Sequence, residues 1–217
     1  MDIKVQIEDV LSFHKGLEYK PENNSLEGEL FLPDGDSYDV VINLNSYPRL
    51  FPIVYETGGR IPVKMDRHVY PESGSLCFTT RARCQILLKT IIKSLLDFIN
   101  EILIRYLENN SIYEIDKKYP TEEYPHGKRG RIEGYKDILE LDDVISTARA
   151  MLMACLERPL VIHQNCYCGS KRRLRKCCRK KHLANLRKLY LVDVDILNQD
   201  LNDFKDEIDA HLEKRKK

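Results

Sequence analysis

The sequence predicts an α+β protein in which helices flank an antiparallel sheet. Two observations carry this prediction. Short segments with alternating apolar residues are separated by turn residues, and longer segments with apolar residues at helical spacing lie before and after them. Hydrophobic residues make up 42% and charged residues 32% of the 217-residue chain, which is an ordinary globular composition. The net charge of +1 gives no overall argument for a nucleic-acid partner.

The first part of the chain begins with a helix and continues with strands. Residues 3–14 have apolar residues at helical spacing and predict a short helix. Alternation then predicts a strand at 25–33, and the turn at 34–37 joins it to a second strand at 38–44. A third strand follows at 53–57, after two X-Pro turns. These strands predict an antiparallel meander.

Helices dominate the remainder of the chain. The most apolar segment, 85–107, predicts a helix with a wide buried face, and the charges spread along it argue against a membrane span. Residues 109–135 are polar and rich in Tyr, Gly and Pro, which predicts irregular structure. Further helices are expected at 136–157 and 181–213.

The cysteine pattern points to a metal in a reducing compartment. Charges throughout residues 1–15 argue against a secretory signal, so we expect a cytoplasmic protein. The chain has seven cysteines, an odd number, and four of them lie close together near the carboxyl end. In the cytoplasm such a cluster favours metal binding over disulfides. We expect Cys84 and Cys155, which have apolar neighbours, to be core residues.

The sequence CYCGSKRRLRKCC holds two tight cysteine pairs, Cys166 with Cys168 and Cys177 with Cys178. Four thiolates close a tetrahedral zinc site, and four protein ligands leave no open position, which predicts a structural zinc. His182 is an alternative fourth ligand, ranked below Cys178. The run closely resembles the SEC-C motif found at the carboxyl end of SecA.

Residues 171–188 are rich in Lys and Arg and contain no acidic residue, whereas residues 193–213 are rich in acidic residues. The basic run is compatible with RNA, with an acidic protein surface, or with neutralising the metal site and the acidic helix. Few aromatic residues are interleaved, so stacking on single strands has weak support. We expect protein docking rather than nucleic-acid binding.

Residues 67–78, RHVYPESGSLCF, place Cys77 after a Gly-Ser turn in a long irregular segment. Four nearby cationic or ionisable side chains predict a positive local field and a low thiol pKa: Arg67, His68, Arg81 and Arg83. The alternative is that Leu76-Cys77-Phe78 is a short apolar run entering the core, with an inert thiol.

The order of elements and residues 47–78 resemble ubiquitin-conjugating enzymes, and the resemblance covers about residues 1–107. It implies that fold, and it implies that Cys77 holds a protein C-terminus as a thioester. The family's His-Pro-Asn triplet is absent, which leaves the oxyanion donor open. His68, close to the triplet's expected position, could take that role, act as a base, or order the loop.

A bacterial branch of this family, found in CBASS-type antiphage operons, is the better match. YPHGKRGRIEGYKDIL, at 124–139, is similar to its downstream HG segment, which implies that His126 lies beside Cys77; a surface histidine is the alternative. The implied partner is a cGAS/DncV-like nucleotidyltransferase. Its C-terminus is accepted by Cys77 and then passed to an amine or released. A non-catalytic protein-binding adaptor is the alternative function.

The predicted domain organisation has three parts. Residues 1–110 form the ubiquitin-conjugating-like core, residues 111–160 a helical extension carrying the YPHG segment, and residues 161–217 the zinc knuckle with a final helix. The sequence has no Gly-rich nucleotide-binding fingerprint, so activation of the acyl group is expected to come from a partner.

Overall fold

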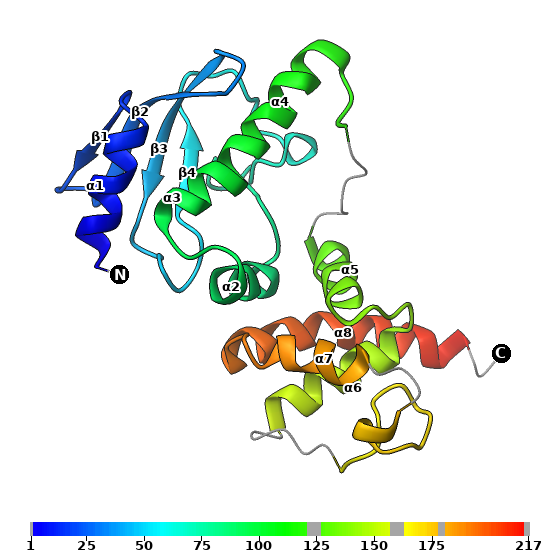
Figure 1. The fold of residues 1–217 in the computed structure, drawn as a ribbon. Coiled ribbons are helices and arrows are strands. Elements are labelled where there is room, and N and C mark those ends of the chain that lie inside the picture. Colours follow the sequence, from blue (N-terminus) through cyan, green and yellow to red (C-terminus); the bar gives the residue numbers. More distant parts are fainter. Residues whose placement is uncertain (1, 121–126, 157–162, 178–180, 215–217) are drawn as a thin grey trace. The chain divides into compact units, whose positions relative to one another are not determined.

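A computed structural model describes residues 2–120, 127–156, 163–177 and 181–214 (Figure 1). The chain divides into two compact units. Unit 1 comprises Met1–Thr79 and Leu87–Glu123, and unit 2 comprises Thr80–Ile86 and Tyr124–Lys217. Sheet and helices are both present, so the predicted α+β class is confirmed. The three-part division at residues 110 and 160 stays a prediction.

Unit 1 is built on a four-stranded antiparallel meander. The strands are β1 (Leu17–Lys20), β2 (Ser25–Phe31), β3 (Ser37–Asn43) and β4 (Ile53–Glu56), in the order β1-β2-β3-β4 (Figure 1). The last three strands lie where alternation predicted them. The first was missed because four residues before a Pro-Glu-Asn-Asn turn are too few to show a period of two.

One face of this sheet is apolar and buried. Leu26 of β2 lies opposite Ile42 of β3, and Ile42 lies opposite Val54 of β4, so the three side chains form a row across the sheet. All three are fully buried. The register is therefore fixed by burial, because a slip of one residue would turn this row toward water.

Unit 1 contains α1 (Ile3–Phe13), which was predicted, and most of a broken segment that replaces the single helix predicted at 85–107. Its pieces are α2 (Arg81–Thr90), α3 (Leu95–Phe98), the π-helical turn η2 (Ile99–Leu103) and α4 (Ile104–Asp116).

A capping box causes this break. Ser94 Oγ accepts a hydrogen bond from the Asp97 amide at 3.0 Å, and the Asp97 carboxylate accepts one from the Ser94 amide at 2.9 Å. These bonds satisfy backbone donors that a new helix leaves open, so the chain restarts a helix at Leu95. The spacing of the apolar residues suggested one continuous helix, so the prediction missed this start.

Unit 2 is helical. It contains the first residues of α2 together with α5 (Gly127–Leu139), α6 (Val144–Leu156), η3 (Leu174–Lys176), α7 (Lys181–Leu189) and α8 (Val194–Lys214). Among the described residues, no helix combines the length and apolar character needed to cross a membrane.

The single helix predicted at 136–157 is wrong, because α5 ends and α6 begins within it. Glu140 takes a left-handed conformation (φ 53°) that ends α5. The Asp143 carboxylate then accepts a hydrogen bond from the Ser146 amide at 2.8 Å and caps α6. The irregular stretch predicted at 109–135 is also partly wrong, since α4 continues to Asp116 and α5 begins at Gly127.

A buried carboxylate connects three helices of unit 2. Asp200 of α8 is 1% exposed and accepts hydrogen bonds from Tyr135 of α5 at 2.9 Å and from Arg81 of α2 at 2.8 Å. A buried charge is tolerated when it is paired in this way. These bonds hold the start of α2, four residues beyond Cys77 in the chain, within the helical unit.

Candidate functional site

Residues 163–177 form a compact loop that presents cysteines on one side. An isolated bridge pairs Asn165 with Arg173, and the Cys166 amide donates to the Arg172 carbonyl at 2.7 Å. Gly169 has a positive φ of 74°, which allows the sharp turn after Cys168. The loop therefore returns on itself and brings Cys177, directly after η3, back to the first two cysteines.

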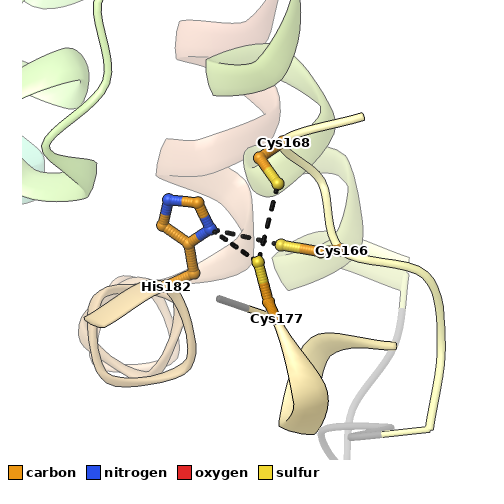
Figure 2. A group of neighbouring side chains, drawn as sticks. All are labelled: Cys166, Cys168, Cys177 and His182. Atoms are coloured by element: carbon orange, nitrogen blue, oxygen red, sulfur yellow. Dashed lines mark hydrogen bonds between the residues drawn. The ribbon is translucent and has the colours of Figure 1, made fainter. Parts of the chain in front are cut away.

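Four side chains converge at this loop (Figure 2). The Sγ atoms of Cys166, Cys168 and Cys177 and a ring nitrogen of His182 all lie within 4.8 Å of one another. Cys166, Cys177 and His182 are buried, and Cys168 is half-buried. Three ligand atoms come from the loop and the fourth comes from α7, so the group joins the loop to the helices of unit 2.

The separations within the group fit a tetrahedral metal ion. Cys168 Sγ lies 3.7 Å from Cys177 Sγ, and His182 Nδ1 lies 3.3 Å from Cys166 Sγ and 3.5 Å from Cys177 Sγ. A tetrahedral zinc site has S···S edges of about 3.8 Å and S···N edges of about 3.5 Å, from its usual bond lengths. Three of the separations are therefore close to tetrahedral edges, and the four residues could hold a metal ion.

Three of the four predicted cysteines, Cys166, Cys168 and Cys177, are brought together, and that they bind zinc stays a prediction. Cys178 lies outside the described residues. His182, the lower-ranked alternative in the sequence, completes the described set. Its carbonyl accepts a hydrogen bond from the Tyr167 hydroxyl at 3.1 Å, and the two rings lie 5.0 Å apart. Buried Tyr167 thus holds the first turn of α7 against the loop.

Without a bound cation, the environment of Cys166 disfavours its thiolate. Burial raises the pKa of Cys166 to about 12, and the neighbouring thiols of Cys168 and Cys177 raise it as well. At neutral pH the thiol of Cys166 is therefore protonated unless a cation compensates the charge. A bound metal ion supplies that charge, so metal binding at this group releases protons.

The second candidate site is the hairpin that carries Cys77 in unit 1. Val69 bridges Leu76, and the Cys77 amide donates to the His68 carbonyl at 2.7 Å. Gly74 turns the chain with a φ of 73°. The long irregular segment predicted here is present, apart from the short turn η1 (Met65–Arg67). Cys77 closes the hairpin opposite His68.

The Cys77 thiol is half-buried and donates a hydrogen bond to Tyr70 Oη at 3.1 Å. Burial raises the pKa of this thiol above its ordinary value, and the Tyr70 hydroxyl lowers it in part. The low pKa expected from the sequence is therefore wrong. The physical reason is burial, which disfavours the charged thiolate. Two of the nearby arginines also have other partners. Arg81 pairs with Asp200, and the Arg67 guanidinium bonds Asn110 at 2.8 Å.

His68 takes a left-handed backbone conformation, with φ 52° and ψ 40°. Its carbonyl accepts from the Cys77 amide and from the Tyr106 hydroxyl at 3.0 Å, and its ring packs edge-on against Tyr119 at 5.4 Å. These contacts order the loop, which was one of the predicted alternatives. A role for the ring in catalysis stays a prediction, and His126 lies outside the described residues.

Two residues near the thiol were given no role from the sequence. Tyr70 stands inside the RHVYPESGSLCF segment, and its spacing from Cys77 could have suggested contact across a hairpin. Tyr106 lies 29 positions beyond Cys77 on α4 and donates to the carbonyls of Arg67 and His68. No local signal could have identified it, because only the fold brings α4 to the hairpin.

Comparison of this chain with family models, curated proteins and solved structures gives no match. The Cys166/Cys168/Cys177/His182 group and the Cys77 hairpin are therefore the features on which a functional proposal rests. Cys84 is buried, as predicted, and Cys155 is half-buried.

Proposed function

We propose that this chain is a cysteine-thioester acyl carrier, a ubiquitin-conjugating-like transferase in which Cys77 accepts the C-terminus of a partner protein. The observation that carries the proposal is the half-exposed Cys77 thiol, which ends a hairpin after a four-stranded meander and lies 3.1 Å from a tyrosine hydroxyl. The order of helix, meander, irregular segment with cysteine, and helix also supports the resemblance to that family.

The chemistry is acyl exchange at sulfur. The Cys77 thiolate attacks the carbonyl carbon of an activated C-terminus, a C–S bond forms, and the activating group leaves with the electron pair of its bond. An amine or water then attacks the thioester, and the Cys77 thiolate leaves. The Tyr70 hydroxyl and the His68 ring are the candidates for stabilising the oxyanion or moving the proton.

The partner in this proposal is a cGAS/DncV-like nucleotidyltransferase of a bacterial CBASS-type antiphage operon, and the setting is the cytoplasm. The partner's C-terminus is the acyl group, and His126 is a further candidate for the active site. Activation is supplied by another protein, consistent with the lack of a Gly-rich nucleotide-binding fingerprint in the sequence.

The metal in this proposal is zinc, held by Cys166, Cys168, Cys177 and His182 in a SEC-C-like knuckle. The support is the match between the ligand separations and tetrahedral edges, together with the soft, thiolate-rich donor set. Four protein ligands leave no position for substrate, so zinc stabilises the loop and takes no part in acyl transfer.

Trapping of the acyl group tests the proposal. The chain is expressed with the other proteins of its operon, and species that shift on non-reducing gels but not on reducing gels are identified by mass spectrometry. Cys77→Ala is expected to lose the adduct, and Cys77→Ser to convert it into an ester that survives thiols. Cys155→Ala, which removes another half-buried thiol, is the control and is expected to keep the adduct. An adduct that persists in Cys77→Ala excludes the proposal.

The second candidate is a non-catalytic adaptor that keeps the fold and the metal site as a scaffold. The observation in its favour is the raised pKa of Cys77, since an inert buried thiol has this property. Alkylation of the native protein with iodoacetamide separates the two. Faster modification of Cys77 than of an unfolded-protein cysteine control favours the carrier, and slower modification at every pH favours the adaptor.

A further inference from the structure

An open hollow of about 560 Å³ lies in unit 2 between the end of α6 and the metal-binding loop. Its apolar wall comes from α6 and from Tyr167 of the loop, and two cationic side chains stand on it. Its lining includes Arg149, Leu152, Met153, Leu156, Tyr167 and Lys171. Its size is in the range of protein sites that take a small ligand or a few peptide side chains.

The apolar wall is exposed to solvent. Leu152 is 47% exposed and Leu156 is 79% exposed, although they lie one turn apart on the same helix. Single exposed leucines are common on proteins, but adjacent ones that line a hollow mark interaction sites more often than bare surface. This part of α6 is therefore suited to receive an apolar group.

The hollow is also cationic. Arg149 extends over the loop, where its Nη1 would lie 3.6 Å from a methyl group placed on Gly169. Lys171 follows at the rim. Further exposed cations continue along the loop: Arg172, Arg173, Arg175 and Lys176. Within the described ranges, none of these six side chains is paired with a carboxylate. Their charge is available to an anionic ligand.

The side chains around the hollow favour one class of ligand. Leu152 and Leu156 stand at its open rim, where they could contact an apolar group that enters it. RNA would need exposed rings for base stacking, and the ring among the lining residues, Tyr167, is 2% exposed. A peptide supplies both an apolar side chain for the hollow and carboxylates for its rim.

We propose that this hollow is a docking site for a peptide segment of a partner protein in which an apolar side chain is flanked by Asp or Glu. The apolar side chain lies against Leu152 and Leu156, and the carboxylates pair with Arg149 and Lys171. This site goes beyond the acyl-carrier function and does not depend on Cys77, so either proposal stands or fails without the other.

The test uses the full-length, zinc-loaded protein and a phage-displayed library of random peptides. Enriched sequences are expected to combine Leu, Ile, Met or Phe with neighbouring Asp or Glu. The consensus peptide is then synthesised with a fluorescein label, and its affinity is measured by fluorescence anisotropy. Raising the salt concentration from about 50 mM to about 300 mM is expected to weaken binding, because the rim contacts are screened.

Three substitutions locate the binding. Arg149→Glu, Leu152→Glu and Lys171→Glu are each expected to weaken binding roughly tenfold or more, since each removes an attractive contact and adds a repulsive charge. All three side chains are exposed, so folding, checked by circular dichroism and zinc content, is expected to be unchanged. Ile115→Glu, at an exposed apolar position on α4 of unit 1, is the control.

Other outcomes overturn the proposal. Selection of basic or purely polar peptides excludes the stated ligand class, and binding that all three substitutions leave unchanged excludes the hollow. A single-stranded oligouridine or vesicles containing phosphatidylserine could instead bind more tightly than any selected peptide. If that binding is lost in the same variants, the surface belongs to RNA or to a membrane.

Discussion

Replacing His182 is the most direct test of the ligand set proposed for the zinc site. His182 Nδ1 lies 3.3 and 3.5 Å from two of the cysteine sulfurs, and the side chain is fully buried. His182→Ala leaves three thiolates and a vacant position for water. We expect the protein to bind zinc with sharply reduced affinity, and Cys178→Ser to leave zinc affinity nearly unchanged.

The magnitude follows from the number of ligands. Structural zinc sites of this type bind with about 10–16 kcal/mol at neutral pH, so one of four ligands accounts for about 2.5–4 kcal/mol. At about 1.4 kcal/mol per factor of ten, this corresponds to a loss of about two to three orders of magnitude in affinity. His182→Cys restores a fourth ligand and is expected to recover most of it.

Competition with a chromophoric zinc chelator measures these affinities at one fixed pH. Circular dichroism of the helices checks that a fall in affinity does not come from unfolding, which matters because His182 is buried. The opposite pattern would refute the assignment. If Cys178→Ser loses zinc while His182→Ala retains it, the fourth ligand is the cysteine and the ring at this position has only a packing role.

The remaining predictions concern protons and the Cys77 hairpin. Because burial raises the pKa of Cys166 to about 12, zinc must displace its proton, so zinc affinity should fall at least about tenfold for each unit of pH lowered; a pH-independent affinity in the chelator assay contradicts this. Tyr70→Phe removes a hydrogen bond that lowers the pKa of Cys77, so the midpoint of its iodoacetamide pH–rate profile should move upward; an unmoved midpoint means that the contact is not made in solution. The Arg60 guanidinium lowers the pKa of Asp36 to about 2 from 3.8, so this pair stabilises the fold above pH 3.8 and the effect is lost as the pH falls toward 2. In urea unfolding, Asp36→Asn should therefore be less stable than wild type at neutral pH and closer to it near pH 2; a constant difference refutes the linkage.

Strands and the first helix were predictable because their signals are local. Alternation over seven residues identifies β2 and β3, and an Asp-Gly turn joins them. The helix boundaries were less accurate where a polar residue caps a new helix inside an apolar stretch. Ser94 and Asp143 are such caps. The helical spacing of apolar residues continues across both positions and gives no sign that a new helix begins there.

The two sites differ in how far residues close together in the sequence determine them. Cys166, Cys168 and Cys177 lie on one short loop, so their spacing was enough to predict a cluster that could bind a metal. His182 belongs to the next helix, and its distance to the sulfurs depends on how α7 packs against Tyr167. For Cys77, spacing indicated a thiol after a turn, but its environment depends on Tyr70 across the hairpin and on burial.

The sequence by itself determined the α+β class, the meander and the positions of the cysteines, because each of these follows from residues that are neighbours in the chain. Only the tertiary structure decided the protonation preference of Cys77 and the engagement of its neighbouring arginines. It also decided that His182 joins the three cysteines and that a cationic hollow lies beside them. These properties depend on burial and on distances between residues remote in sequence, and a pattern of residue types contains neither.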